Sequence, residues 1–302
     1  MIVLWRKTFS PNRLSLPVQN HFFVLNSFHL CRMKTILVLT DFSPAAEHAT
    51  AYAAQLAKVV EASVRLLHVY QLPVAMSDMP VLMVSAEDLK KSADAGLQRA
   101  KEAAERLHPK AVFEMESRLG DVVEEAEDVS KQRDVFALVA GTKSMSGVER
   151  FLFGSTAQAL VKKCSRPVII VPVGAQLNTP KNIALAVDFI NADEVPTTKI
   201  LAATGALQAS LQVVHVETEN EQASNPTPLL DALQLAPSAY HLLKDESVGQ
   251  GLKHFADQNK IDLVIVSPHK HNLLERLFFK GHTNQILHEL SVPVMTLRGS
   301  SE

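Results

Sequence analysis

Short apolar runs alternate along the chain with longer segments of helical periodicity. In the first part, strands are predicted at residues 35–40 (TILVLT), 64–69 (VRLLHV), 111–116 (AVFEME), 135–140 (VFALVA) and 167–172 (PVIIVP). The segments between them predict helices at residues 44–60, 86–107, 121–132 and 155–164. Apolar strands that alternate with helices are typical of an α/β fold, in which helices cover both faces of a parallel sheet.

The same order of elements returns later in the chain. Strands are predicted at residues 182–187 (NIALAV), 211–216 (LQVVHV), 239–244 (AYHLLK), 262–267 (DLVIVS) and 293–298 (PVMTLR). Asp41 matches Asp188 and His68 matches His215, each pair 147 positions apart. This self-similarity indicates an internal repeat.

Two tandem domains are therefore expected, at residues 33–175 and 181–302. Glu149 matches Glu275 at a spacing of only 126, so the second domain lacks 147 − 126 = 21 residues. The deletion falls between the second and fourth strands, where the first domain has a long loop and its longest helix. Loops tolerate such changes better than strands do.

The first 32 residues differ from the rest, because they contain no acidic residue and show no sustained period. The apolar stretch HFFVLNSFHL is too interrupted for a secretory signal, whereas an organellar transit peptide is one alternative. We favour an upstream start codon read into untranslated sequence, with Met33 as the initiator. This leader is predicted to be poorly ordered.

Composition and charge exclude several classes of protein. With 47% hydrophobic and 21% charged residues, the chain is not disordered as a whole. A formal net charge of -2 gives no overall attraction to nucleic acid or to an anionic membrane, and no apolar run reaches the roughly 20 residues that span a bilayer. The two cysteines, Cys31 and Cys164, have no paired spacing, which favours a reducing, cytoplasmic compartment.

The segment GTKSMSGVERFLFGST, residues 141–156, follows the fourth predicted strand. Ligands of doubly wound sheets bind at the carboxyl ends of the strands. Gly141 and Gly154 let the backbone turn tightly beside a ligand, and Ser155 and Thr156 add hydroxyls next to the unpaired N–H donors of a helix start. This pattern suits a phosphate chain, and a purely conformational turn before a helix is the alternative.

Asp41 stands at the end of the first predicted strand. There its carboxylate can accept a hydrogen bond from a base or a ribose hydroxyl. The alternative is an N-cap of the next helix, because TDFSP is a good helix-start sequence. Both roles can coexist.

These residues carry a family resemblance. The segment TDFSPAAEHA, the strand end LLHV and a glycine loop of the form G-x2-G-x9-G-[ST] resemble the universal stress protein family in its tandem two-domain form, from Met33 to about Arg298. The resemblance implies a five-stranded parallel sheet in each domain, with strand order 3-2-1-4-5 and the adenine nucleotide alpha hydrolase-like fold. It also implies a bound adenine nucleotide, ATP or AMP, with or without Mg²⁺.

Carried over by position, the resemblance implies that Asp41 faces the adenosine and Val69 lines the adenine pocket. The implied phosphate-binding residues are Gly141, Thr142, Ser144, Gly154, Ser155 and Thr156. Ser144 departs from the pattern, because the family has its second glycine there. A serine can offer its N–H and hydroxyl to phosphate, but it resists positive φ and adds bulk.

The second copy departs further from the glycine pattern. The aligned stretch, SPHKHNLLERLFFKGHT, has Ser267, Lys270 and Lys280 at the three glycine positions. Its histidines, His269 and His271 among them, leave open a basic pocket for an anion or a metal site, but no third-ligand spacing supports a metal. We expect the second domain to be a structural half, with no metal in the protein.

Two features predict packing and not ligand contact. The apolar run at residues 151–153 recurs at residues 277–279, although only the first copy keeps its glycines. The last strand of each domain would be an exposed edge if unpaired, and the resemblance implies pairing of such strands across a two-fold interface. The two halves then form an internal pseudo-dimer, and a homodimer of whole chains is a further expectation.

Three classes of function remain. The favoured one is a nucleotide-binding regulator of the stress response, in which the occupied state alters the binding of unknown protein partners. The others are a nucleotide-independent interaction protein of the same fold and an enzyme, such as a slow ATP hydrolase or a protein that phosphorylates itself at Ser155. The enzyme is less favoured, because no base and nucleophile stand together beside the glycine loop.

Overall fold

The computed structural model describes residues 34–72, 85–132, 134–144, 151–152, 154–189, 194–217, 225–245, 247–267 and 290–299. Three predictions lie outside the described residues and stay predictions. They concern the disorder of the leader, the side chains of the apolar runs at residues 151–153 and 277–279, and the histidines of the second loop.

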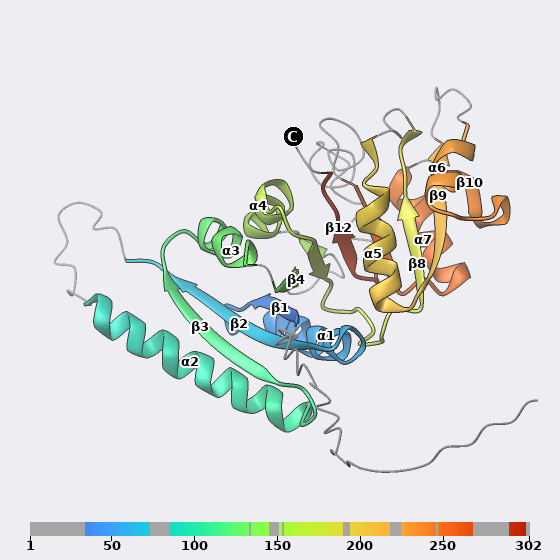
Figure 1. Cartoon of the computed structure of the whole chain (residues 1–302). Coiled ribbons are helices and arrows are strands. Elements are labelled where there is room, and N and C mark those ends of the chain that lie inside the picture. Colours follow the sequence, from blue (N-terminus) through green and yellow to red (C-terminus); the bar gives the residue numbers. More distant parts are fainter. Residues whose placement is uncertain are drawn as a thin grey trace, which may run out of the picture. The chain divides into compact units, whose positions relative to one another are not determined.

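Ten of the described strands form one sheet, in the order β10-β9-β8-β11-β12-β7-β4-β1-β2-β3 (Figure 1). The first half contains β1 (Lys34–Leu39), β2 (Ala62–Tyr70), β3 (Phe113–Leu119), β4 (Val135–Gly141) and β7 (Val168–Val171). The second half contains β8 (Asn182–Ala186), β9 (Ser210–Glu217), β10 (Tyr240–Lys244), β11 (Leu263–Val266) and β12 (Val294–Thr296). Within each half the strands are parallel and follow the order 3-2-1-4-5, so the predicted fold class is confirmed.

The two halves join through their last strands. β12 pairs antiparallel with β7, and Met295 lies opposite Ile169. The expected pairing of these edge strands within one chain is therefore observed. Because the pairing is antiparallel, the carboxyl ends of the strands point in opposite directions in the two halves.

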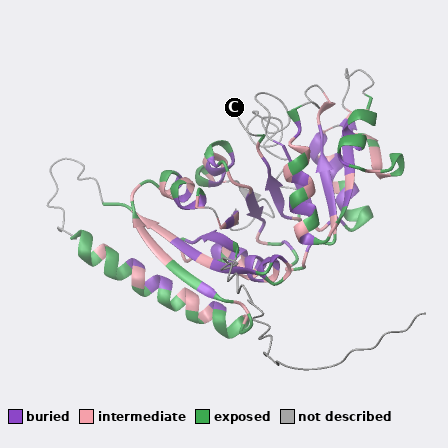
Figure 2. Cartoon of the chain, viewed as in Figure 1, coloured by how far each residue is buried: buried purple, intermediate pink, exposed green. Residues whose placement is uncertain are grey.

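Helices cover both faces of the sheet. The first half has α1 (Pro44–Val60), α2 (Ala86–Leu107), α3 (Val122–Ser130) and α4 (Ser155–Lys163), and the second has α5 (Thr197–Leu207), α6 (Thr227–Ala232), η2 (Pro237–Ala239) and α7 (Val248–Asn259). One hydrophobic layer includes side chains of α1, α2, α5 and α6, and the other includes side chains of α3, α4 and α7. Central strands are thus buried on both sides (Figure 2), which explains why they are continuous apolar runs.

Polar caps fix the starts of the two longest helices. Ser43 caps α1, where its Oγ accepts a hydrogen bond from the Ala46 N–H at 3.3 Å. Ser85 caps α2 and accepts from the Asp88 N–H at 3.1 Å. Such caps satisfy backbone donors that have no partner within the helix.

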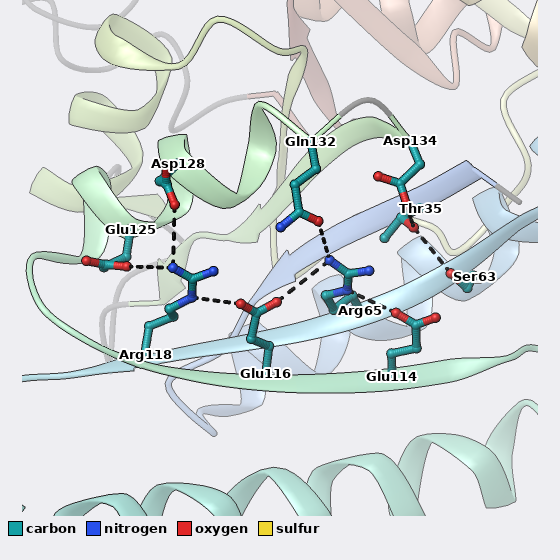
Figure 3. Close-up of polar contacts among 10 residues, drawn as sticks. All are labelled: Thr35, Ser63, Arg65, Glu114, Glu116, Arg118, Glu125, Asp128, Gln132 and Asp134. Atoms are coloured by element: carbon teal, nitrogen blue, oxygen red, sulfur yellow. Dashed lines mark hydrogen bonds and ion pairs between the residues drawn. The ribbon is translucent and has the colours of Figure 1, made fainter. Parts of the chain in front are cut away.

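The edge strand β3 carries charge on the face opposite α2, where a central strand carries apolar residues. Arg65 on β2 lies 3.0 Å from Glu114 and 3.7 Å from Glu116, and Arg118 lies 2.7 Å from Glu116 (Figure 3). Arg118 also reaches carboxylates of α3. Charges of this kind on an edge strand oppose pairing with another chain.

Two features of the loops refine the prediction. The second half has the six-residue α6 where the first has the 22-residue α2, in agreement with the deletion inferred from the repeat. Inside the glycine loop, β5 (Lys143–Ser144) pairs antiparallel with β6 (Phe151–Leu152). The sequence analysis missed this pair, because strands of two residues give no periodic signal. No described helix is long and apolar enough to cross a membrane.

Candidate functional site

A hollow of about 230 Å³ opens at the carboxyl ends of β1, β2 and β4, beside the first turns of α1 and α4. Six of the eight predicted site residues line it: Asp41, Val69, Gly141, Gly154, Ser155 and Thr156. These residues come from four separate segments of the chain, which the parallel sheet brings to one edge. The position is the one expected for a ligand of a doubly wound sheet.

The other two predicted residues are not among those that line the hollow. Thr142 is buried, its N–H donates to the Val171 carbonyl at 3.1 Å, and its hydroxyl has no hydrogen-bond partner among the described residues. Ser144 lies in β5, with its backbone opposite Phe151, and its side chain is outside the described part of the structure.

Asp41 is exposed at the rim of the hollow, and its carboxylate is held by the next turn of the chain. Oδ1 accepts hydrogen bonds from the Ser43 N–H at 3.1 Å and from the Ser43 hydroxyl. The N-cap of α1 is Ser43, so the alternative role of Asp41 as N-cap is wrong. The aspartate instead orients the capping serine, and its other oxygen, Oδ2, takes part in neither of these bonds.

Phe42 makes the turn between Asp41 and Ser43 sharp. Its φ is 62°, a left-handed conformation that is uncommon for a bulky residue. The ring stacks on His68 with centroids 4.4 Å apart, and Nδ1 of His68 lies 2.8 Å from the Thr40 carbonyl oxygen. These contacts hold a strained turn in place, which is a common feature of functional sites.

His68 is a lining residue that the sequence analysis did not assign to the site. In the sequence it stands in the strand end LLHV and repeats as His215. The repeated residue has the same contact, since Nδ1 of His215 lies 2.9 Å from the Val187 carbonyl oxygen. A histidine that contacts the carbonyl group just after the first strand is therefore part of the fold in both halves. In the first half this histidine also lines the hollow.

Gly141 is required by close packing. A Cβ at this position would lie 2.3 Å from the carbonyl oxygen of Ala45, in the first turn of α1. No real Cβ contact is that short, so glycine alone lets the end of β4 approach α1 this closely.

Gly154 has the opposite surroundings, although the sequence analysis treated the two glycines alike. It is the N-cap of α4, its φ is -60°, and a Cβ there would meet no described residue within 4 Å. Neither conformation nor packing therefore requires glycine at this position. Open space in front of the residue is compatible with a ligand that approaches the backbone closely.

The start of α4 is an electropositive helix end. Gly154 supplies no side-chain cap, and the first turn carries no acidic residue. Ser155 and Thr156 are exposed in this first turn, where the backbone N–H groups have no partner within the helix. Lys162 and Lys163 occupy the last turn, at the opposite end. Free N–H groups and the helix dipole together favour an anion at this end of the helix.

Among the described residues, neither a reactive thiol nor a metal-binding cluster is found. Burial, followed by the nearby Glu127, raises the pKa of the Cys164 thiol to about 12, so this group stays protonated at neutral pH. Among the described residues there is no group of three or more His, Cys, Asp or Glu side chains that could hold a metal ion.

A model of the universal stress protein family matches residues 33–172 and again residues 179–298. The two matches repeat in tandem and cover most of the chain. The chain belongs to the universal stress protein family. The resemblance inferred from the motifs is thus confirmed.

Several known members of the family are similar to this chain. Universal stress protein Slr1230 of Synechocystis sp. is 24% identical over 291 residues, which are 88% of this chain and 100% of that protein. The crystal structure of a universal stress protein from Archaeoglobus fulgidus covers 88% of this chain and 99% of its own, with a TM-score of 0.60 at 15% identity. A universal stress protein from Archaeoglobus fulgidus in complex with dAMP covers 46% of this chain and 96% of its own, at 22% identity and a TM-score of 0.33.

Proposed function

We propose that the first half of this universal stress protein binds an adenine nucleotide, ATP or AMP, in the hollow at the ends of β1, β2 and β4. The occupied state then regulates the stress response by changing which proteins the chain binds. Under this proposal residues 33–175 are the nucleotide-binding domain and residues 181–302 are a structural domain.

The uncapped start of α4 is the observation that carries the proposal. A cradle is formed by its N–H donors, the hydroxyls of Ser155 and Thr156, and the open space over Gly154. A Cβ added at Gly154 would fill part of this cradle. Phosphate oxygens are the ligands that such a cradle suits best, because they are anionic and accept several hydrogen bonds.

The opposite wall of the hollow suits a nucleoside. Asp41 is an acceptor at the rim, and Val69 and Leu39 offer apolar surface at the strand ends. A carboxylate next to apolar surface would hold a ribose hydroxyl while the base packs against the valine. Mg²⁺ bound together with ATP would supply positive charge at the end of the hollow near Ser155 and Thr156.

The size of the hollow sets a limit on how the nucleotide is held. About 230 Å³ is below the usual range of roughly 300–1,000 Å³ for small-molecule pockets. The hollow would therefore enclose only part of the nucleotide, with the rest exposed. An exposed part of the ligand is also what a protein partner needs in order to detect the occupied state.

Calorimetric titration with ATP and with AMP tests the proposal, using Asp41→Ala and its repeat counterpart Asp188→Ala. We expect Asp41→Ala to abolish measurable binding, because an acceptor at the nucleoside is lost. Asp188→Ala is the matched control and should keep the affinity of the unchanged protein. Equal affinity of the unchanged protein and Asp41→Ala would overturn the assignment of the hollow.

A further inference from the structure

A second cavity, of about 420 Å³, lies between α1 and α2 and is larger than the hollow at the strand ends. Its volume falls within the usual range of roughly 300–1,000 Å³ for small-molecule pockets. Thr40 lines both spaces, whereas Phe42 lines only this cavity and its neighbours Asp41 and Ser43 line only the hollow. The family resemblance gives this cavity no role.

Small side chains on α2 leave the space unfilled. Gly96, Ala100, Ala103 and Ala104 lie on one face of the helix. Each alanine follows Gly96 or Ala100 by three or four residues, which is the spacing of neighbours on a helix face. The ring of Phe42 closes one end of the cavity, where a Cβ on Gly96 would lie 2.6 Å from its Cζ. Because α2 presents glycine and alanine at these positions, room for an apolar ligand remains between α1 and α2.

An apolar side chain at the wall of this cavity is exposed to solvent. Leu107, at the end of α2, lines the cavity and is 74% exposed. With the alanine methyl groups and Phe42, it forms a mainly apolar surface. Covering such a surface with a ligand removes apolar area from water, which is favourable.

Two polar groups at the cavity lack partners within the described part of the chain. Arg99 is exposed and forms no ion pair with any described residue. Nε2 of His108 is buried and has no hydrogen-bond partner among the described residues. Burial, followed by the nearby Lys58, lowers the pKa of His108, so its imidazole is neutral at pH 7.

The lining contains one acidic residue, but this residue is not an ion-pair partner of Arg99. Glu47 is in the first turn of α1, where the positive end of that helix already stabilises its charge. A guanidinium without a partner favours carboxylate or sulfonate groups, which it binds through charge-assisted hydrogen bonds.

We propose that the cavity between α1 and α2 binds a small apolar acid, with its hydrocarbon body against Leu107 and the alanines and its acidic group at Arg99. His108 gives the ligand a further hydrogen bond. The site does not depend on the proposed nucleotide function, because its lining holds none of the phosphate-binding residues.

The test is a fluorescence titration of the full-length chain with anilinonaphthalene sulfonate, an aromatic acid of this class. We expect saturable binding at one probe per chain. Ala103→Leu should fill the cavity and weaken binding by about tenfold or more, which is about 1.4 kcal/mol. Ala95→Leu is the matched control, because Ala95 is exposed on the same helix and does not line the cavity, and it should leave binding unchanged.

A second pair of variants tests the charge without filling the core. Arg99→Gln should weaken probe binding by about three- to tenfold, since a charge-assisted hydrogen bond is lost. Arg106→Gln, at another exposed position on α2 outside the lining, should have no effect.

The proposal is wrong if the probe does not saturate, or if both leucine variants and both glutamine variants bind it like the unchanged protein. ATP titration of Ala103→Leu separates the two sites. Unchanged ATP affinity with lost probe binding supports an independent site. Absence of ATP binding in every variant would contradict the nucleotide proposal alone.

Discussion

The two halves of the chain share one plan and differ at the edge of the sheet where ligands are expected. In the first half β1 ends at Leu39 and α1 begins at Pro44. The repeat spacing of 147 would start the matching helix at 44 + 147 = 191, but α5 begins at Thr197, six positions later. Ser43 caps α1 with its side chain, whereas Pro196, the N-cap of α5, makes no side-chain capping hydrogen bond.

The carboxyl end of the fourth strand also differs between the two halves. Gly141 leaves room for the carbonyl of Ala45, whereas its counterpart Ser267 carries a Cβ and a hydroxyl that donates to the Leu297 carbonyl at 3.3 Å. In the second half a side-chain hydrogen bond therefore stands where the first half has the close approach of α1. The same fold can therefore carry different edges, because the buried strands and the edge loops depend on different residues.

The largest effect is expected from adding a side chain at Gly141. Gly141→Val would collide with the Ala45 backbone, and overpacking of this kind destabilises a protein by about 1–3 kcal/mol. Nucleotide binding should be lost as well, because the first turn of α1 must move. Ser267→Gly is the counterpart in the second half and should lower stability by only about 1 kcal/mol, through the lost hydrogen bond. Thermal or urea unfolding measures both changes.

The two repeated histidines should separate stability from binding. His215 is 5% exposed, so His215→Ala leaves the buried Val187 carbonyl without its bond and should lower stability by about 1–3 kcal/mol. His68 is less buried, and His68→Ala should lower stability less but weaken ATP binding, because His68 lines the hollow. Equal effects of both variants on ATP affinity would contradict the difference between the halves.

Gly154→Ala should affect the ligand and barely the fold. A Cβ there meets no described neighbour, so the unfolding free energy should fall by no more than about 1 kcal/mol, because alanine is a poorer N-cap than glycine. ATP affinity should fall by about tenfold, because the methyl group occupies space at the phosphates. Gly205→Ala is the control, since its Cβ also meets nothing, and it should stabilise α5 by about 0.5–1 kcal/mol without any change in affinity.

The smallest effect is expected at Ser144, where the family pattern has a glycine. Ser144→Gly should tighten ATP binding by a few-fold, that is by less than about 1.4 kcal/mol, if the loop touches the phosphates. Unchanged affinity in calorimetry would mean that this position does not contact the ligand.

Much of the fold was predictable because several local signals agree. Apolar runs marked the buried strands, and the bounds predicted for α1 and α2 match the structure, since Ser43 and Ser85 are strong caps. The family resemblance supplied the strand order, which apolar periodicity alone does not determine.

Features that depend on packing were not predictable. The left-handed φ of Phe42 has no local signal, because bulky residues rarely adopt it. Gly141 and Gly154 look alike in the sequence, and only their neighbours in space show that the first is required by packing. The cavity beside α2 likewise depends on how two distant helices meet.

The most direct test of the difference between the halves is to denature the purified protein and identify any released nucleotide by mass, with its amount per chain. Our proposal predicts about one ATP or AMP per chain, held by the first half. Two nucleotides per chain would contradict the loss of the second site. A protein that carries none, and also ignores ATP and AMP in titration, would contradict nucleotide binding altogether.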